Sequence, residues 1–308
     1  MSAEHPIIAI TGASGAGSSA VIKALERIFY RERIKAAYID GSAFHLYDRK
    51  TMREKVRQAK EEGQVLSHFS PAGNCLDKLE SLFFEYAAVG RGVYRHYLHT
   101  QEQADRHGQE PGTLTPWRQM DPDTDLLLYR GLHGAAVIGD IDIAQYPDLG
   151  IGMAPNANLE WIRKIQRDSS MRGYSRAEVQ ESILERLHDY VHYITPQFSR
   201  THINFQMVPI VDTSDPFGDE EAPEAQECFL VMRFTPPFLP NFVPLLRDIP
   251  GAFMSRRNTL VVQGSKMGTA IELILMPIIH DMITKSRTLR GIASVPEDRG
   301  AGVLGLVE

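Results

Sequence analysis

Glycine and serine residues at the spacing of a phosphate-binding loop follow the first apolar run of the chain. Ile7–Ile10 has the composition of a buried strand, and Gly12, Gly15 and Gly17 separate it from a segment with helical spacing. A glycine turn between a strand and a helix points backbone N–H groups into one concavity, where the helix dipole favours an anion. This arrangement predicts phosphate binding at the start of the helix.

The loop fits the pattern G-x-x-x-x-G-K-S/T at every defined position except one. Ser18 stands where the pattern has lysine, and Ser19 stands where it has the hydroxyl that binds magnesium. A glycine-rich turn that binds no ligand is the alternative for so short a motif. The phosphate-binding interpretation assigns the nucleotide to Gly12, Ser14, Gly15, Ala16, Gly17, Ser18 and Ser19, and a metal contact to Ser19.

Composition limits the classes of partner. The chain has 308 residues, 43% of them hydrophobic, which is enough for one α/β domain or two smaller ones. Its net charge of -6 gives no general attraction to nucleic acid, so a polyanionic ligand needs a local group of cations. Residues 1–6 hold no apolar signal core and no later run approaches the length of a membrane span. We therefore expect a cytoplasmic protein with neither a nucleic acid nor a membrane as partner. Its two distant cysteines, Cys75 and Cys228, cannot form a cysteine-rich metal site.

The order of the apolar runs predicts an α/β fold with a mostly parallel central sheet. Short runs typical of buried strands are separated by longer segments whose apolar residues recur at helical spacing. After the first strand we expect others at Ala36–Ile39, Asp125–Tyr129, Leu149–Met153, Phe205–Val211, Phe229–Phe234 and Thr259–Val262. Helices are expected at Val21–Tyr30, Asp48–Glu62, Leu76–Val89, Asn158–Arg172, Arg176–Ile194 and Met267–Ile283.

Two regions differ from this alternation. Arg91–Met120 is polar and contains glycine and proline, so we expect a lid or loop rather than core. The segment 286–308 is rich in glycine and polar residues, and we expect a flexible tail there. No break in composition divides the remainder, which we interpret as one domain over residues 1–285.

One predicted helix, Asn158–Arg172, carries three cations on one side. At 100° per residue Lys164, Arg167, Asp168 and Arg172 fall together. One interpretation is a solvated charged face with an internal Arg167–Asp168 pair. The phosphate loop upstream favours a second interpretation, a cation cluster that closes over transferred phosphoryl groups, because phosphoryl transfer depends on positioning and charge neutralisation.

The chain also resembles the short bacterial form of phosphoribulokinase. The matching motifs run in unbroken order from about residue 6 to about residue 285: TGASGAGSS, GSAFHLYDR, YRGLHGA, NLEWIRKIQRDSSMRGY, YITPQFSRTHINFQMVPIVDTSDPF and QGSKMGTAIELI. The resemblance implies a P-loop NTPase-type domain with extra strands. It also implies transfer of the γ-phosphoryl group of ATP to the 1-hydroxyl of ribulose 5-phosphate, a step of the Calvin cycle, by a homo-oligomer. The short bacterial form does not require the loop lysine, which accounts for Ser18.

The resemblance implies roles for individual residues. Contacts with the sugar phosphate are expected at His45, Arg49, His99 and Arg172. Contacts with the transferred phosphates are expected at Lys164, Arg167 and Arg172, with Asp168 holding that cluster in register. ATP and Mg²⁺ are the expected cofactors. An effector site for NADH, together with subunit contacts, is expected at Arg186, Arg233 and Arg256.

Two positions depart from the family pattern. The family reads G-D-[AS]-F-H, and its aspartate takes the proton of the attacking hydroxyl; this chain has Ser42, which is no base at neutral pH without a partner of its own. The family reads Y-E-G-L-H-G with a glutamate at the magnesium site, where this chain has Arg130, a reversal of charge. In addition, the acidic S-[YP]-E-A-N-[ED] segment has become Ser70–Cys75.

These changes remove acids and keep the cations that bind phosphate. We therefore expect a weakened magnesium site and slow or absent turnover, with Asp40 and Asp48 as candidate stand-ins for the base. A rival hypothesis is a catalytically impaired paralogue that binds nucleotide or sugar phosphate and regulates an active subunit. A third hypothesis is a related nucleoside kinase, and a fourth is a kinase in which substitutions were introduced to abolish catalysis.

Overall fold

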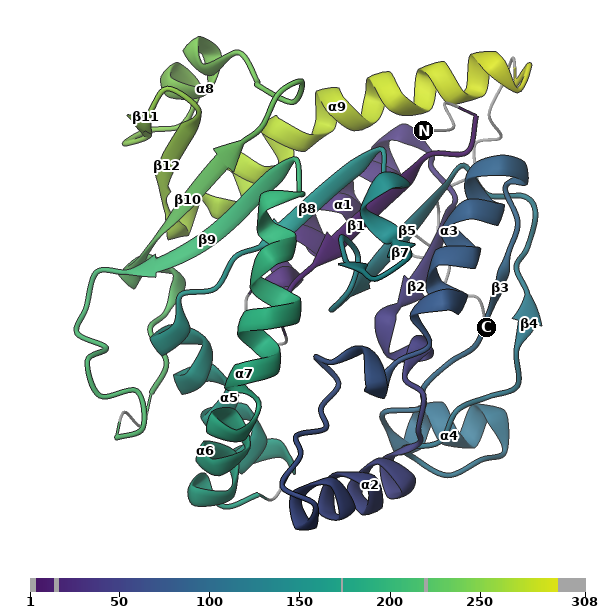
Figure 1. Cartoon of the computed structure of the whole chain (residues 1–308). Helices are drawn as coiled ribbons and strands as arrows, with labels where there is room; N and C mark the ends of the chain where they lie inside the picture. Colours follow the sequence, from purple (N-terminus) through teal and green to yellow (C-terminus); the bar gives the residue numbers. More distant parts are fainter. Residues whose placement is uncertain (1–3, 14–16, 173, 219–220, 293–308) are drawn as a thin grey trace.

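The apolar runs form the strands of one eight-stranded sheet in the computed structural model, which describes residues 4–13, 17–172, 174–218 and 221–292. In chain order these strands are β1 (Ile7–Thr11), β2 (Ala36–Asp40), β5 (Leu126–Gly131), β8 (Leu149–Met153), β9 (Ile203–Pro209), β10 (Cys228–Phe234), β11 (Phe253–Arg256) and β12 (Thr259–Gln263). In space they follow the order β11-β12-β10-β9-β8-β1-β5-β2 (Figure 1). Two small separate sheets pair β3 (Val93–Tyr94) with β4 (Arg118–Gln119) and β6 (Val137–Ile138) with β7 (Ile141–Asp142).

The half of the sheet that follows the phosphate loop is parallel. Every neighbouring pair from β2 to β9 is parallel, and the pairs that join β9, β10, β12 and β11 are antiparallel. The predicted fold class is confirmed. Parallel strands end at the same edge of a sheet, so the residues that follow β1, β2 and β5 meet there. Since β5 lies between β1 and β2, Arg130 has Ile10 as its register neighbour on one side and Asp40 on the other.

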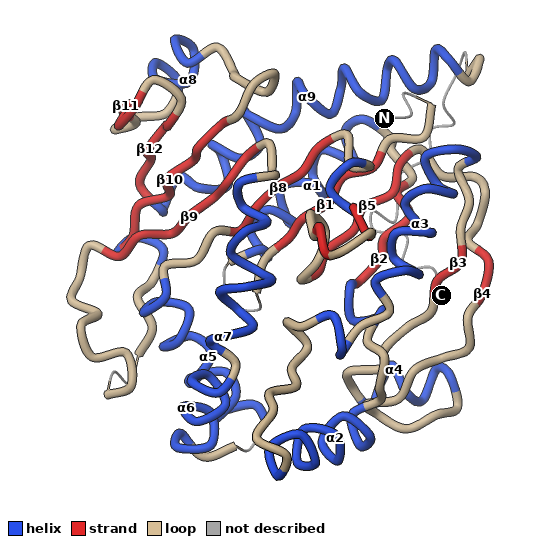
Figure 2. Tube along the Cα trace, viewed as in Figure 1, coloured by secondary structure: helices blue, strands red, loops and turns tan. Residues whose placement is uncertain are grey.

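Helices cover both faces of the sheet (Figure 2). They are α1 (Ser18–Glu32), α2 (Arg49–Glu61), α3 (Leu76–Val89), α4 (Gln101–His107), α5 (Ala157–Arg172), α6 (Arg176–Glu185), α7 (Leu187–Asp189), α8 (Phe242–Asp248) and α9 (Met267–Leu289).

Alternation of side chains along β1 divides the core between the two faces. Ile8 and Ile10 belong to the cluster that includes α1 and α9, whereas Ile7 and Ala9 belong to the cluster that includes α3. All four side chains are at most 1% exposed. A parallel strand buried on both faces has no polar alternation, which is why a continuous apolar run was sufficient to predict it.

The predicted helix over Arg176–Ile194 is wrong as a single element. α6 ends at Glu185, a short α7 follows, and Tyr190–Ile194 forms a π-helix. The buried side chain of Asp189 accepts a hydrogen bond from Ser67 Oγ at 2.6 Å, a contact across 122 positions of sequence that helical spacing does not reveal. The wider π-helical turn marks a local departure from regular α-helical packing.

Arg91–Met120 is more ordered than a loop. It holds β3, β4 and α4, and Thr100 with Gln103 forms a capping box at the start of α4. Tyr94 and Leu98 are buried, so the segment adds to the core and the expectation of a mere lid is wrong. The apolar residues are too widely spaced among polar ones to show this in the sequence.

The boundary predicted for the tail is also wrong. α9 continues to Leu289, Ser286 is fully buried, and its hydroxyl donates to Glu4 O at 2.6 Å. Arg287 and Arg290 form ion pairs with the buried Asp125, with N–O distances of 3.3 and 3.1 Å. Residues up to 292 therefore belong to the folded part, and residues 293–308 of the predicted tail lie outside the described residues.

The C-terminal helix corrects one further expectation. The helical stretch Gly264–Leu289 is long and apolar enough, by length and composition, to cross a membrane. One side of this stretch, which includes Ile271, Ile274 and Ile279, is buried in the core with α1. The core helix of a globular domain can have the same length and composition.

Candidate active site

The phosphate loop ends in a helix start that has no side-chain cap. Gly17 precedes α1 with a φ of 91°, a left-handed conformation that glycine adopts without strain, and no side chain caps the first turn. Ala20 N–H bonds to Gly17 O at 3.3 Å, and among the described residues no side chain occupies the other N–H groups of that turn, which an anion could accept from. Gly12 approaches β8 so closely that an added Cβ would lie 2.7 Å from the Cβ of Met153. The predicted phosphate contacts Ser14, Gly15 and Ala16 lie outside the described residues.

Arg130 contacts the loop at the position of the missing lysine. Its side chain is half-buried at the end of β5, and Nε donates a hydrogen bond to Ser18 Oγ at 3.1 Å. A cation therefore lies at the first turn of α1 although residue 18 itself is neutral. In the sequence the absent loop lysine and the reversed charge at position 130 are separate features, whereas in space they meet in one contact.

A second cation beside the loop was not predicted. The guanidinium of Arg163, on α5, would lie 3.8 Å from a Cβ added at Gly17. Burial lowers the pKa of Arg163, and Cys228 partly opposes the shift. Arg163 lies one helical turn before Arg167 and so borders the predicted cation face, but helical spacing does not show that α5 packs against the loop.

Ser42 has a carboxylate partner. Its backbone N–H and its hydroxyl both donate to Asp40 Oδ1, at 2.9 and 2.5 Å, and Asp40 caps the short 3-10 helix Gly41–Phe44. His99 Nε2 lies 2.9 Å from Ser42 Oγ. A hydroxyl has one proton and two lone pairs. Because that proton points to Asp40, the nitrogen of His99 must donate, and one lone pair of Ser42 is left for a further donor.

Asp48, the second stand-in named from the sequence, has a different role. Its Oδ1 accepts a hydrogen bond from the backbone N–H of Thr51 at 2.7 Å, so the carboxylate caps α2. This hydrogen bond lowers the pKa of Asp48. Of the two candidate carboxylates, Asp40 therefore contacts Ser42, whereas Asp48 caps α2.

Three of the four predicted sugar-phosphate residues, His45, Arg49 and His99, lie together around this turn. Arg49 Nη2 donates to His99 O at 3.1 Å, which joins the start of α2 to the segment before α4. His45 stacks on His68 with ring centroids 3.8 Å apart. Arg95 donates to Ala43 O and His45 O at 2.9 and 2.6 Å and holds the turn in place, a role that no motif in the sequence indicated.

Three imidazoles in this region are held neutral. Burial lowers the pKa of His45 well below its ordinary value, with further lowering by His68. Burial lowers the pKa of His68 and of His133 to about 4. The ring nitrogens Nδ1 of all three are buried without a hydrogen-bond partner among the described residues. Protonation would therefore place an uncompensated charge beside the site.

The cation cluster of α5 forms as the helical spacing predicts. Lys164 Nζ lies 2.5 Å from Asp168 Oδ2, and Arg167 Nη2 lies 2.8 Å from Oδ1. The carboxylate is buried, with 5% of its side chain exposed. Burial alone would raise the pKa of Asp168, but the hydrogen bond from Lys164 and the charge of Arg167 lower it. Arg172 ends the helix, and its side chain lies outside what the structure describes.

A cavity of about 510 Å³ extends this cluster towards α2 and α6. Lys164 and Asp168 line it together with Arg53, Tyr174 and Arg186. Arg53 Nη2 donates to Tyr174 OH at 2.9 Å across the cavity. Burial lowers the pKa of the Arg186 guanidinium, and Asp168 opposes the shift.

The structure does not bring the three predicted effector residues together. Arg186 lies in this cavity, whereas Arg233 and Arg256 are exposed on β10 and β11, where both are register neighbours of Thr259 in the strand between them. Arg233 also donates to Phe198 O at 2.8 Å.

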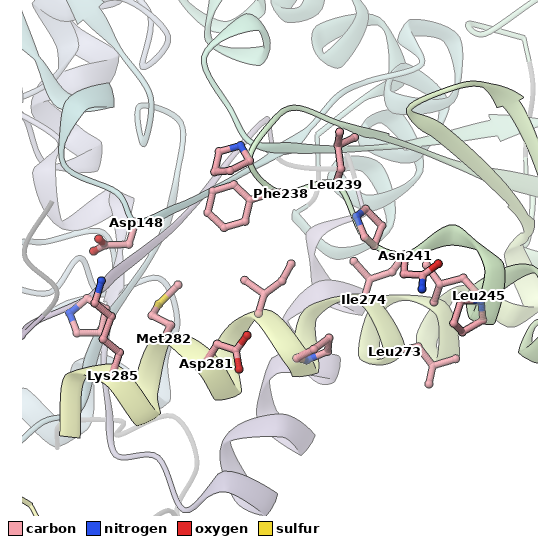
Figure 3. Close-up of a pocket in the computed structure, with 16 residues that line it drawn as sticks. Asp148, Phe238, Leu239, Asn241, Leu245, Leu273, Ile274, Asp281, Met282 and Lys285 are labelled. Atoms are coloured by element: carbon pink, nitrogen blue, oxygen red, sulfur yellow. The ribbon is translucent and has the colours of Figure 1, made fainter. Parts of the chain in front are cut away.

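A larger cavity of about 840 Å³ lies elsewhere, between α9 and the segment that leads into α8 (Figure 3). Its walls are mainly apolar, with Phe238, Leu239 and Ile274 among them. Lys285 is the one cation among its described lining residues; Asp281 lies one turn before it on α9, and Asp148 lies on another segment of the lining (Figure 3). None of the predicted site residues lines it, so we assign the chemistry to the sheet edge instead.

Comparison with known proteins fixes the family. The model of the phosphoribulokinase / uridine kinase family matches residues 7–214. The chain is 50% identical to the chromosomal phosphoribulokinase of Cupriavidus necator over 288 residues, which cover 93% of this chain and 99% of that one. The chain belongs to the phosphoribulokinase / uridine kinase family. The phosphoribulokinase of Sinorhizobium medicae is likewise 50% identical over 289 residues, covering 94% and 100%.

A solved member of the phosphoribulokinase / uridine kinase family has the same fold. The structure of the phosphoribulokinase from Rhodobacter spheroides superposes with a TM-score of 0.85 at 44% identity and covers 93% of this chain and 100% of that one. The similarity extends past residue 214, so it includes the antiparallel strands and α9 as well as the region of the family model.

Proposed function

We propose that this protein is an ATP-dependent kinase that converts ribulose 5-phosphate to ribulose 1,5-bisphosphate. Its relatives named phosphoribulokinase support the proposal, since two of them are 50% identical over nearly the whole chain. The observation that carries it is the order of groups along the sheet edge. The phosphate loop, Arg130 and the Ser42–Asp40 pair lie at the carboxyl ends of three adjacent parallel strands, β1, β5 and β2.

Arg130 would supply the charge that the phosphate loop lacks. A guanidinium has five N–H donors; that of Arg130 bonds from Nε to Ser18 at 3.1 Å and also hydrogen-bonds the side chain of Tyr38. The remaining donors and the N–H groups of the first turn of α1 would bind the nucleotide phosphates. Charge-assisted hydrogen bonds to phosphate are among the strongest that side chains form.

Arg49 and the α5 cluster would hold the acceptor and neutralise the transferred group. Arg49 is fixed by its bond to His99 O, beside the turn that carries Ser42 and His45. Asp168 orients Lys164 and Arg167 from a buried position. Positioning and charge neutralisation are what phosphoryl transfer requires from a protein.

The described residues do not fit a metal held by the protein. They contain no group of three or more His, Cys, Asp or Glu side chains able to hold a metal ion. At the phosphate loop the side chains are the hydroxyl of Ser19 and the cation of Arg130, whereas magnesium prefers carboxylate and phosphate oxygens. We therefore assign no step to a metal, and expect any Mg²⁺ to arrive on the nucleotide.

Regulation by NADH and assembly into a homo-oligomer also belong to this proposal. Arg233 and Arg256 flank one residue of β12 and would serve a single anion-binding surface. Arg186 would serve the substrate side, because it shares a cavity with Lys164. The groups named here come from one sheet and its helices, which supports a single kinase domain.

The proposal is tested by ADP release from ATP in the presence of magnesium and ribulose 5-phosphate, with uridine as a control acceptor. We expect slow turnover with ribulose 5-phosphate and none with uridine; turnover with uridine would favour a nucleoside kinase. Thermal stabilisation by ATP and ribulose 5-phosphate, without turnover in the wild type or in Ser42→Asp, would instead favour a regulatory paralogue.

A further inference from the structure

The proposed reaction leaves one proton without an acceptor. When the hydroxyl oxygen of the sugar bonds to the γ-phosphorus, the bond to the bridging oxygen of ATP breaks and its electron pair leaves with ADP. The proton of the attacking hydroxyl must go to a group of the protein, to water or to an oxygen of the transferred phosphoryl group. Ser42 occupies the position where the family pattern has an aspartate, and a serine hydroxyl alone is too weak a base.

We propose that Asp40 accepts this proton through the hydroxyl of Ser42. This inference rests on the proposed function and names the proton acceptor of the same site. The sugar hydroxyl donates to Ser42 Oγ, whose own proton passes along the existing 2.5 Å hydrogen bond to Asp40 Oδ1. Ser42 ends the step as a neutral hydroxyl and Asp40 as a neutral carboxylic acid, which then returns its proton to water.

The geometry around Ser42 supports a relay in this direction. His99 Nε2, at 2.9 Å, occupies one lone pair of Oγ as a donor and fixes the rotation of the hydroxyl. The second lone pair accepts from the substrate. Asp40 is solvent-exposed at the end of β2, so it can release the proton after each turnover.

The location of Asp40 relative to the nucleotide site also supports the relay. Asp40 and Arg130 are register neighbours on β2 and β5, and Arg130 contacts the first turn of α1. The loops after these strands are close, since an added Cβ on Gly131 would lie 2.8 Å from the Cα of Gly41. The proton acceptor and the proposed nucleotide cation thus lie on adjacent strands, as in-line transfer between two bound substrates requires.

Asp40→Asn tests the relay without removing the cap. Asparagine accepts the hydrogen bond from Ser42 N–H as aspartate does, so the 3-10 turn keeps its cap, but the amide cannot take a proton. Loss of a general base costs about 10² to 10⁴ in rate. We expect kcat to fall by at least about 100-fold, with the KM values for ATP and ribulose 5-phosphate nearly unchanged. Asp48→Asn is the matched control, since it removes the charge of the neighbouring capping carboxylate and should leave kcat unchanged.

Ser42→Ala and two double variants separate a relay from direct transfer. If Ser42 carries the proton, Ser42→Ala lowers kcat as much as Asp40→Asn, and the double variant lowers it no further. Retention of kcat by Ser42→Ala would mean that Asp40 takes the proton directly and would overturn the relay. In a Ser42→Asp chain the new carboxylate is the acceptor, so adding Asp40→Asn should then cost little.

The outcomes distinguish failure of the relay from failure of the proposed function. Wild-type turnover that Asp40→Asn does not change overturns the relay alone. Turnover by Ser42→Asp but not by the wild type also overturns the relay, while the kinase assignment stands. Absence of ribulose 5-phosphate-dependent ADP release from both chains overturns the proposed function itself.

Discussion

The guanidinium of Arg130 donates a hydrogen bond to the hydroxyl of Ser18, over 3.1 Å and 112 positions of sequence. Position 18 lacks the lysine of the phosphate-loop pattern, and position 130 carries a cation where the family pattern has an acid. The contact makes these two departures complementary, because the charge missing from the loop enters from the neighbouring strand.

Replacement of Arg130 should therefore weaken ATP binding. For Arg130→Gln we expect the KM for ATP to rise about 10- to 100-fold, the loss of one charge-assisted contact of about 1.5–3 kcal/mol. Adding Ser18→Lys should restore most of this affinity. Steady-state kinetics with varied ATP measure both effects, and Arg57→Gln, at an exposed position of α2, is the control. If Arg130→Glu tightens magnesium-dependent ATP binding instead, position 130 belongs to a metal site.

Asp168→Asn, alone and combined with Lys164→Met, should show whether the α5 cluster contributes to stability, to activity or to both. Removing one partner of a buried ion pair costs about 3–5 kcal/mol, since it leaves uncompensated charge. We expect a lower unfolding temperature and a lower kcat/KM for ribulose 5-phosphate. Lys164→Met combined with Asp168→Asn should recover stability but not activity. Recovery of both would show that the cluster is structural only.

The buried imidazoles predict a loss of stability in mild acid. As the pH falls from 6.5 towards 4, the unfolded chain binds protons that His68 and His133 in the folded state do not, so the free energy of unfolding falls. For His133 alone the loss amounts to about 3 kcal/mol. Burial raises the pKa of Asp148 to about 6 and of Glu160 to about 7. These two groups bind protons more readily in the folded state, so they increase the free energy of unfolding as the pH falls.

A difference measurement isolates the histidine effect. Urea unfolding of the wild type and of His133→Gln between pH 8 and pH 4 leaves the contributions of Asp148 and Glu160 common to both chains. We expect the wild type to lose more stability than the variant over this range. Parallel curves for the two chains would contradict the assignment of His133 as buried and neutral.

The pairing of Asp125 predicts where the chain can be shortened. A chain that ends at Lys285 loses Arg287 and Arg290, which would leave the fully buried carboxylate of Asp125 without its guanidinium partners. We expect it to be less stable than a chain that ends at Ile292 by about 3 kcal/mol or more. Asp125→Leu in the shorter chain should recover part of the difference. Equal unfolding temperatures for the two lengths would contradict this role.

The sequence predicted the parts of the fold that depend on local pattern. The strand at Ile7–Ile10 could be predicted because burial on two faces requires a continuous apolar run. The cation face with Lys164 and Asp168 could be predicted because residues four apart lie on one side of a helix. Contacts between segments far apart in the chain produce no such local pattern in the sequence. The division of the Arg176–Ile194 helix, anchored by Ser67 on Asp189, could not be predicted for that reason.

The same distinction applies to the candidate site. The sequence showed which residue types stand at positions 42 and 130, but it did not show which side chains Ser42 and Arg130 contact. Asp40 could be named only as one of two nearby carboxylates, and the hydrogen bond to Ser42 distinguishes it from Asp48. Ser18 is adjacent to Arg130 only because β5 inserts between β1 and β2.

The ion pairs of Asp125 have a consequence for the order in which the protein is made. The carboxylate lies immediately before β5, and the two guanidinium groups that pair with it are 162 and 165 residues further along the chain. A nascent chain of 280 residues already contains every strand of the sheet and every group of the candidate site. It still lacks the side chains that fix the start of the strand that carries Arg130. During synthesis this strand therefore lacks the stabilisation from both ion pairs until the end of α9 has emerged.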